Sequence, residues 1–552
     1  MQRFWLRSGR LISGLHCSTF RASGTSVSGK GIRRGGPGGG SGRGGFRGSV
    51  FLTTAAASAA QSGPAMARGE RLSVAPRICI LGGGFGGLYT AVRLESLLWP
   101  QGSKPQVTLI DQSERFVFKP LLYELLNGGA SPEEVAPFFT KLLAPYSTNF
   151  IQGSVQAVEE EEEHRSVTAL SSGGRVVLSS GVAVEYDWLV LALGADSVFF
   201  GIEGVKEHCI PFCSYPDAMK VEAELRALEA RPGTAEVLVV GTGYAGIELA
   251  TTVAERLGSK GHVRMVTAGK EILEGCPAGQ QEAARKSLQE QSVPVITEAL
   301  VTRVGLTESQ PASTSQPARK SITLKTPATD NQVLQADIVL WTAGSSPVSK
   351  EGVSESTPKL PFPHTEKGAV KTDPTLRVRD HPRVFALGDV SGSDSPDPST
   401  SGNSLPATAQ VAFQQADYVA WNLWACINKR PLLPFKYQHL GDMMSLGRSS
   451  GAVTLPIPVA PPLQQAANNV AFRSLLSLAG IQFGANNGQA VTVEGPLASA
   501  LRRAAYWYRQ PTAEQRLSVG ASWLQQAATE GATLAQRVLS GQSSQSSRAN
   551  RP

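Results

Sequence analysis

The sequence has only six cysteines in 552 residues, and no two of them form a Cys-x-x-Cys pair. The chain therefore lacks the redox-active dithiol that disulfide-reducing enzymes use. The cysteines and histidines also do not cluster at spacings that would bind zinc, an iron–sulfur cluster or haem, so we predict no metal site. Cys209 and Cys213 lie four residues apart, and we interpret them as buried thiols of a protein in a reducing compartment.

Long hydrophobic runs are also missing. No stretch of about 18 uninterrupted apolar residues occurs, as a transmembrane helix would require. We therefore expect any contact with a membrane to be peripheral, and we expect the protein not to pump ions. With 41% apolar residues, the chain can still build the cores of several folded domains.

Acidic residues are absent from the first 69 positions, which contain ten of the 52 lysines and arginines. This Arg-, Ser-, Gly- and Ala-rich composition predicts a disordered organelle transit peptide over residues 1–75, with an ordinary disordered tail as the alternative. Its first 22 residues resemble a mitochondrial leader, whereas the later part suits a plastid. The other 42 basic and 45 acidic residues give a formal charge of −3, so we predict no nucleic-acid binding.

Two glycine-rich motifs stand out in the remaining sequence, each directly after a short apolar run and before a helical pattern. The first fingerprint consists of Gly82, Gly83, Gly84, Phe85, Gly86 and Gly87. The second contains Gly241, Gly243 and Gly246. Glycines at these spacings allow a tight strand-to-helix turn, close approach of a pyrophosphate to the backbone and close packing of the helix. Two ordinary glycine-rich turns are the alternative, but two motifs in this context predict two dinucleotide sites, one for a flavin and one for a nicotinamide.

Further residues fit the same interpretation. Asp111 ends a predicted strand 24 residues after Gly87, where an acid binds ribose hydroxyls or simply caps a turn. Two later strands, over 186–195 and 336–344, end near Gly194 and Gly344, where backbone can approach a cofactor. A third, over 383–389, ends in Gly388 and Asp389. This last motif resembles the second flavin motif of the two-dinucleotide flavoproteins, and the resemblance implies that Asp389 binds the ribityl chain of FAD.

The motif order predicts an α/β fold with two Rossmann-like domains, the second inserted into the first. We assign residues 76–200 and 351–435 to the FAD-binding domain and 201–350 to the NAD(P)H-binding domain. Residues 436–530 form a C-terminal region for membrane association or dimerisation, and 531–552 a disordered tail. Residues 307–320 are interpreted as a surface insertion, whereas 453–490 suggest no role.

A narrower resemblance appears at residues 405–416, Leu-Pro-Ala-Thr-Ala-Gln-Val-Ala-Phe-Gln-Gln-Ala. The segment is similar to the quinone-pocket helix of the type II NAD(P)H:quinone dehydrogenases, which implies that Gln410 and Gln414 lie at a quinone site. The motifs at 116–126 and 437–447 are closest to the plant and algal C-type branch. That branch is associated with chloroplasts, their lipid bodies and mitochondria, and reduces prenylated quinones, including demethylphylloquinone.

The same resemblance concerns nicotinamide binding. Glu248 matches a family glutamate near the nicotinamide–flavin contact; it could orient the nicotinamide or pass a proton, or merely complement the helix dipole. NADH-preferring relatives have an acid where this chain has Thr267. Without that carboxylate, and with Arg264 or Lys270 close enough to help, we expect NADPH to be accepted at least as well as NADH.

The predicted helix over 497–509 combines an apolar stripe with Arg502, Arg503 and Arg509. This composition suits a helix in the plane of a membrane with its arginines on anionic head groups, although a core-facing or dimer-forming helix would have the same pattern. We accordingly expect a chloroplast protein on the thylakoid or plastoglobule surface, with mitochondrial targeting as an addition and a homodimer as one assembly.

Together these features predict an enzyme that moves hydride from NAD(P)H to FAD and then two electrons to a membrane-borne quinone: plastoquinone, demethylphylloquinone or ubiquinone. Two alternatives remain open from the sequence. The flavin could pass electrons to a small redox protein, or the chain could be a NAD(P)H-sensing flavoprotein with little turnover.

Overall fold

The computed structural model describes residues 75–100, 103–160, 173–307, 318–351, 357–392, 405–456, 481–483 and 490–539. The chain divides into Met1–Arg71 and Leu72–Pro552, and all described residues belong to the second unit. The predicted transit peptide therefore lies outside the described residues, apart from its last position. So do most of the predicted insertion at 307–320, most of the segment 453–490, and residues 540–552 of the predicted tail.

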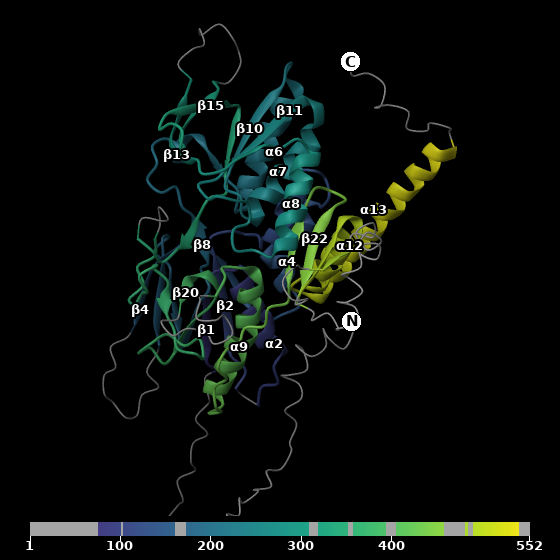
Figure 1. Ribbon diagram of the computed structural model, residues 1–552. Coiled ribbons are helices and arrows are strands. Elements are labelled where there is room, and N and C mark those ends of the chain that lie inside the picture. The colour runs from purple at the N-terminus through teal and green to yellow at the C-terminus, as the bar shows by residue number, and fades with distance from the viewer. Residues whose placement is uncertain are drawn as a thin grey trace, which may run out of the picture. The chain divides into compact units, whose positions relative to one another are not determined.

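The first α/β domain is built on a parallel five-stranded sheet of order β19-β7-β1-β2-β3. Strands β1 and β2 of this sheet are labelled in Figure 1. Its strands are β1 (Arg77–Leu81), β2 (Gln106–Asp111), β3 (Asn149–Gln152), β7 (Trp188–Leu191) and β19 (Val384–Ala386). These apolar runs are buried, as expected for a parallel sheet covered on both faces. Helix α2 (Phe85–Ser96) packs along α9 (Ala409–Ile427). Because β19 pairs with β7, the late segment completes the sheet that the first fingerprint opens.

The second α/β domain repeats this plan. Its parallel sheet has the order β12-β11-β10-β16-β9. The strands are β9 (Ile210–Pro211), β10 (Ala235–Val240), β11 (Gly261–Val266), β12 (Val295–Ile296) and β16 (Ile338–Trp341), and the main helices are α6 (Tyr215–Ala230), α7 (Tyr244–Leu257) and α8 (Ala278–Glu290). Helix α6 begins with a capping box in which the Ser214 side chain accepts from Asp217 N. The predicted α/β fold is confirmed, and it is built on two parallel five-stranded sheets.

Two adjacent strands connect the domains. β8 (Ala195–Ser197) leaves the first domain and β17 (Ser345–Pro347) returns from the second, and they pair antiparallel. Antiparallel sheets flank the cores: β4 (Val155–Glu160), β5 (Gly174–Leu178) and β6 (Ala183–Tyr186), and β13 (Leu300–Leu306), β14 (Lys320–Lys325) and β15 (Gln332–Ala336). The remaining short elements are β18 (Val370–Lys371), β20 (Ser391–Gly392), η1 (Lys119–Leu125), α3 (Pro132–Val135), α4 (Phe139–Leu143), α5 (Val205–His208), η2 (Gly258–Lys260) and η3 (Gly388–Val390).

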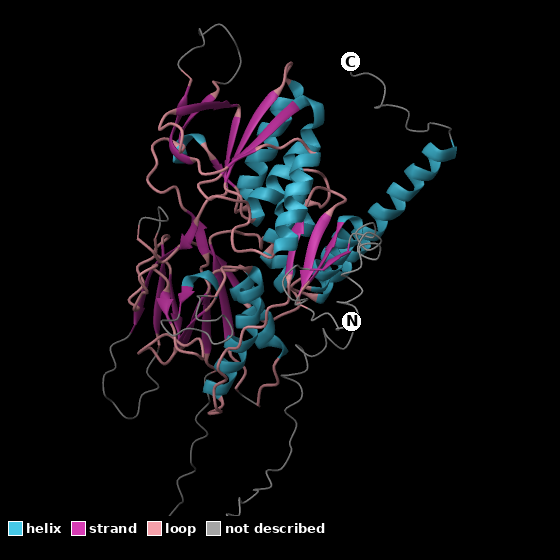
Figure 2. Cartoon of the chain, in the orientation of Figure 1, coloured by secondary structure: helices cyan, strands magenta, loops and turns pink. Residues whose placement is uncertain are grey.

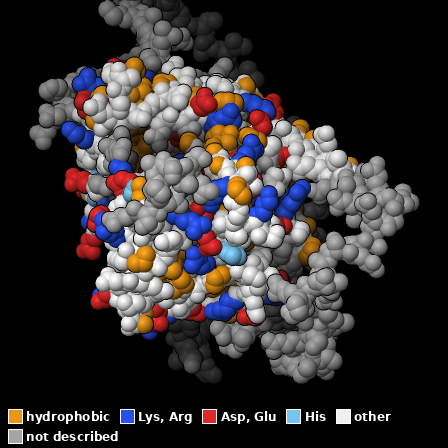
Figure 3. Space-filling view, turned by 90° about the horizontal axis from the view of Figure 1, so that it is seen from above, with side chains coloured by type: hydrophobic (Ala, Val, Ile, Leu, Met, Phe, Trp, Pro, Cys, Tyr) orange, Lys and Arg blue, Asp and Glu red, His pale blue; other side chains and the backbone are white. Residues whose placement is uncertain are grey.

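The C-terminal region forms a third layer of strands and helices (Figure 2). β21 (Asp442–Ser445), β22 (Gly451–Leu455), β24 (Val491–Glu494) and β23 (Ile481–Phe483) pair antiparallel in that order. Helix α12 (Gly495–Tyr508) packs on β22, as does α8 of the second domain, and α13 (Ala513–Leu539) follows. None of the described helices combines the length and apolar character needed to cross a bilayer. On the face seen in Figure 3, lysine and arginine side chains are interspersed with acidic ones.

Candidate functional site

The first fingerprint forms an open cradle at the start of α2. Gly82 has φ +95° and donates from its backbone N–H to Ile110 O at 2.8 Å, and a Cβ there would overlap the Ala192 carbonyl. A Cβ at Gly84, in contrast, would meet no atom within 4 Å. Gly84 is the N-cap of α2, and neither a side-chain cap nor a first-turn acid occupies this helix end. The backbone N–H groups and open space therefore suit a pyrophosphate.

Asp111 lies at the end of β2 and holds this cradle. One carboxylate oxygen accepts from Gly83 N at 2.6 Å, and the other accepts from Ser113 N at 2.7 Å. Burial raises the pKa of Asp111, while these two backbone hydrogen bonds oppose the shift. A carboxylate has about four acceptor positions, so Asp111 retains the capacity to accept from ribose hydroxyls.

The second predicted flavin motif lies beside α9. Gly388 has φ +70°, and its N–H donates to Gln415 Oε1 at 2.6 Å. Asp389 follows in η3, where burial raises the pKa of its carboxyl and the charge of Lys119 opposes this. Gln415 is buried and was not singled out from the sequence. The sequence does place Gln415 directly after Gln414, and adjacent residues of a helix project from different faces. That difference could have indicated a separate role for Gln415.

The second fingerprint repeats the geometry of the first at the start of α7. Gly241 has φ +108° and donates to Val266 O at 2.8 Å, whereas a Cβ at Gly243 would meet nothing within 4 Å. Gly243 is the N-cap of α7, again without a side-chain cap. Gly246 packs against the Gly241 carbonyl, and Gly344 lies under the Phe200 ring. This cradle suits a second dinucleotide.

Thr267 directly follows β11, at the carboxyl end of the second sheet. Its hydroxyl accepts from Gly269 N at 3.2 Å, so a neutral side chain stands at this position. Lys270 lines a nearby cavity of about 580 Å³. Arg264 does not reach this end: it donates to Glu236 at 2.9 Å and to Gln335 O at 3.0 Å. Because Glu236 lies at the opposite end of β10, the expectation that Arg264 assists a 2′-phosphate was wrong.

Glu248 is buried near the start of α7. Its Oε1 accepts from Tyr123 Oη at 2.8 Å and from Ser445 N at 2.9 Å. The residue is only 8% exposed. Burial raises the pKa of Glu248 to about 7. A carboxyl with this pKa can hold or release a proton near neutral pH.

A buried ion pair lies behind Tyr123. Arg502 of α12 donates to Tyr123 Oη at 3.4 Å and to Glu124 Oε1 at 2.6 Å, and Arg503 donates to Glu124 Oε2 at 3.1 Å. Arg502 is 0% exposed. The expected display of Arg502 on a membrane surface was therefore wrong, because this arginine compensates a buried carboxylate. Arg509 is also directed inward, with its guanidinium 4.1 Å from the Phe413 ring centre.

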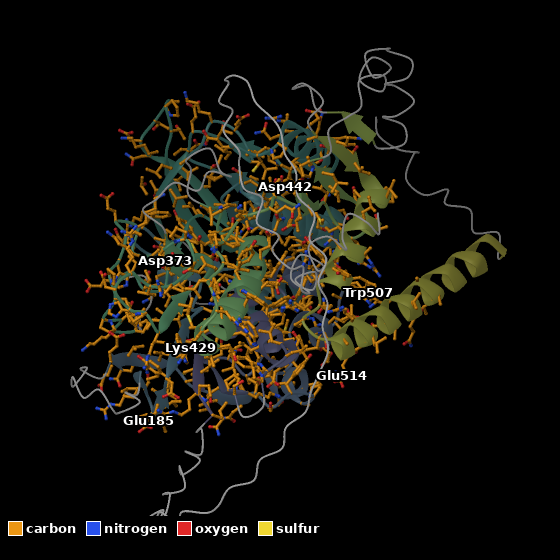
Figure 4. All side chains as sticks on the ribbon, turned by 90° about the horizontal axis from the view of Figure 1, so that it is seen from below. Glu185, Asp373, Lys429, Asp442, Trp507 and Glu514 are labelled. Atoms are coloured by element: carbon orange, nitrogen blue, oxygen red, sulfur yellow. The ribbon has the colours of Figure 1, made fainter. Side chains whose placement is uncertain are left out.

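The two ends of the apolar stripe of α12 face away from the protein, whereas Leu501 packs on the C-terminal sheet. Leu497 and Tyr508 are exposed, as is Trp507, which contacts α13 through a hydrogen bond to Arg516 O at 2.8 Å (Figure 4). The sequence pattern was correctly interpreted as amphipathic, but the arginine face is the one packed against the protein.

Gln410 and Gln414 both bind the segment that leads into β21. Gln410 accepts from Tyr437 Oη and from Leu440 N, each at 2.8 Å, and donates to Gly441 O at 3.1 Å. Gln414 accepts from Gln438 N at 3.0 Å and donates to Gln438 O at 2.9 Å. Both amides therefore fix the backbone of one loop.

The 437–445 segment links the predicted catalytic residues. Its first part binds the two glutamines of α9, and its last residue, Ser445, binds Glu248 of α7. Sequence spacing alone could not show this connection, because Gln410 and Glu248 are more than 150 residues apart and meet only through a third segment.

Residues 76–416 match the family described as pyridine nucleotide-disulphide oxidoreductase, a stretch that includes both cradles. The chain belongs to this family. The oxidoreductase is 42% identical to the alternative NAD(P)H-ubiquinone oxidoreductase C1, chloroplastic/mitochondrial, of Arabidopsis thaliana, over 84% of each chain. It is 36% identical to the demethylphylloquinone reductase NdbB of Synechocystis, over 81% of its length and 96% of that protein. The predicted resemblance to the type II NAD(P)H:quinone dehydrogenases is thus confirmed.

Solved structures share the fold of the oxidoreductase. NDH2 from Plasmodium falciparum gives a TM-score of 0.60 at 16% identity, covering 82% of this chain and 98% of that one. Sulfide:quinone oxidoreductase from Aquifex aeolicus gives 0.57 at 19% identity, covering 79% and 90%. The family implies a flavin and a nicotinamide nucleotide, and the two cradles fit such a pair. All described cysteines of the oxidoreductase are free, and no group of metal ligands occurs among the described residues.

Proposed function

We propose that this chain is an FAD-dependent NAD(P)H:quinone oxidoreductase that reduces a prenylated quinone by two electrons without pumping protons. The observation that carries the proposal is the 437–445 segment, whose first part binds Gln410 and Gln414 and whose last residue binds Glu248. The names of the Arabidopsis and Synechocystis relatives, both quinone-reducing enzymes, support the same reaction.

FAD, when bound, would accept a hydride and pass on two electrons. The first fingerprint would hold its pyrophosphate, and Asp111 its adenosine ribose. Asp389 would accept from the ribityl chain, because a partly buried carboxylate beside Lys119 is a strong acceptor for hydroxyls. Gln415 would keep the Gly388 backbone in place for this contact. Gly194 and Gly344 follow the ends of β7 and β16, where they would lie beside the two cofactors.

The exchanging nucleotide would bind the second fingerprint at Gly241, Gly243 and Gly246. Thr267 supplies no carboxylate against a 2′-phosphate, and Lys270 stands at a neighbouring cavity. We therefore propose that NADPH is used at least as well as NADH.

The quinone would approach α9, where Gln410 and Gln414 hold the 437–445 segment. Glu248 would hold a proton near the nicotinamide side, since its pKa lies close to neutral pH. Plastoquinone, demethylphylloquinone and ubiquinone all have the two carbonyl oxygens that this reaction requires.

A prenylated quinone resides in a membrane or lipid body, so the protein should associate with such a surface. The exposed apolar side chains of α12 and α13 support this: Leu497 is 51% exposed, Leu517 72% and Leu524 74%. The alternative is that two copies of the chain dimerise through these exposed side chains of α12 and α13. We propose a chloroplast location, at the thylakoid or plastoglobule, with mitochondria as a second site.

Stopped-flow absorbance tests the function directly. The purified yellow protein is mixed with NADPH or NADH and then with a naphthoquinone. Rapid flavin bleaching followed by quinone-dependent reoxidation is expected, with rates that rank the two nucleotides. Bleaching that persists with every quinone would overturn the proposal in favour of a protein acceptor or a sensor.

A further inference from the structure

A line of four polar side chains runs from the α9 glutamine toward the surface. Gln410 Oε1 accepts from Tyr437 Oη at 2.8 Å, and Tyr437 Oη lies 3.3 Å from His439 Nδ1. His439 Nε2 lies 3.3 Å from a carboxylate oxygen of Asp442, the first residue of β21. The His439 side chain is 45% exposed, so the line ends at water.

The partners of His439 fix its ring protons. A carboxylate can only accept, so Asp442 keeps a proton on Nε2. When the imidazole is charged, Nδ1–H donates to the Tyr437 oxygen, and the single Tyr437 proton points to Gln410. When the imidazole is neutral, the bare Nδ1 competes with Gln410 for that proton. The charge state of His439 therefore changes the hydrogen bond that the Tyr437 hydroxyl makes to Gln410.

The charged surroundings of His439 favour its protonated form. The hydrogen bond that His439 donates to Asp442 is the main cause that raises the pKa of His439, and burial opposes it. Asp442 in turn faces Tyr244 and Cys276, and burial raises the pKa of both, so they stay neutral. Burial likewise raises the pKa of Tyr437 to about 12. Tyr437 can thus pass a proton on without remaining ionised.

We propose that His439 and Tyr437 carry the solvent proton that quinone reduction consumes to the Gln410 side of the site. The inference rests on the proposed function. NAD(P)H contributes two electrons and one proton as a hydride, whereas conversion of a quinone to a quinol requires two electrons and two protons. One proton per turnover must therefore come from water.

The steps of the transfer balance. With a quinone bound beside Gln410, the Tyr437 hydroxyl would turn from Gln410 Oε1 to the reduced quinone oxygen. It would give its proton to that oxygen as the Nδ1 proton of His439 is transferred to Tyr437. His439 is then protonated again from water. Glu248 is less suited to this uptake, because it is only 8% exposed.

The test uses the full-length holoenzyme and the variants His439→Gln, Tyr437→Phe and His262→Gln. His262 is the control, since its exposed ring pairs with Glu236 on the far side of the second domain. NADPH oxidation is measured with a soluble quinone and with ferricyanide, which takes electrons without protons. The quinone-to-ferricyanide rate ratio should fall about 100-fold in the first two variants, a typical contribution of a positioned proton donor, and stay unchanged in the control.

The pH dependence separates a proton path from a structural role. Asp442→Asn should lower the pKa of His439, which imidazole nitrogen NMR of the protein reports without turnover. The alkaline limb of the quinone rate should move to lower pH by the same amount.

If wild-type enzyme reduces quinone and His439→Gln keeps both its ratio and its pH profile, the proton path is overturned while the proposed function stands. If the wild-type flavin is bleached by NADPH but no quinone reoxidises it, the function fails, and the proton path with it.

Discussion

Glu248 shows how burial sets chemistry at a single residue. Desolvation raises its pKa from 4.5 to about 7, although Tyr123 and Ser445 donate to the charged form. Between these two pH values the folded protein binds a proton that the unfolded chain has released. Stability therefore falls as pH rises from about 4.5 to about 7.

The substitution Glu248→Gln should remove this dependence. Relative to wild type, its free energy of unfolding should be larger at about pH 8 than at about pH 5, by up to about 3 kcal/mol. Denaturant unfolding at the two pH values measures the difference. Glu255→Gln, on the exposed side of the same helix, should show no such change. If the free energies of unfolding of Glu248→Gln and wild type differ by the same amount at both pH values, burial does not raise the pKa of Glu248.

Thr267 makes a second prediction at the residue scale. Thr267→Glu places a carboxylate where the 2′-phosphate would lie, so kcat/KM for NADPH should fall about 10- to 100-fold relative to NADH. Steady-state rates with both nucleotides measure the ratio, and Thr267→Gln controls for size. A ratio that moves equally in the Gln variant would show that charge is not the cause.

At the scale of elements, the fingerprints could be predicted because their signals are local. Gly82 and Gly241 must adopt positive φ within a few residues of an apolar strand, and sequence spacing shows this directly. The orientation of α12 could not be predicted in the same way. Its arginine face packs inward because Glu124 lies there, 378 residues earlier in the chain. The pattern of apolar and charged residues within α12 gives no information on the contact with Glu124.

The substitution Arg502→Met tests the energetic role of α12. It leaves Glu124 buried with Arg503 as its remaining cationic partner, and should cost about 3 kcal/mol of stability. Arg503→Met, at a partly exposed side chain, should cost about 1 kcal/mol or less. Adding Glu124→Gln to Arg502→Met should recover part of the loss. Thermal melts measure all three, and equal losses for the two single variants would argue against the buried pair.

For the molecule as a whole, the C-terminal helices present apolar surface that the α/β domains do not cover. The triple substitution of Leu497, Leu517 and Leu524 by Gln should reduce co-sedimentation with lipid vesicles by about 10-fold or more, since each leucine that enters a membrane contributes about 1.5–3 kcal/mol. Leu300 and Leu306 of β13 are 50% and 51% exposed, as Leu497 is, and their substitution by Gln is the control. If the triple variant still co-sediments with vesicles but no longer forms a dimer, these side chains serve self-association rather than membrane binding.

The paired strands β8 and β17 have a consequence for how such a chain could have been assembled. Ser197 and Ser345 are register partners, so the two points at which the second domain joins the first are already hydrogen-bonded neighbours. A chain without residues 198–344 would need only a tight hairpin turn to remain continuous through the first sheet. The second domain is thus inserted at a position where its removal would leave the two chain ends of the first domain already side by side.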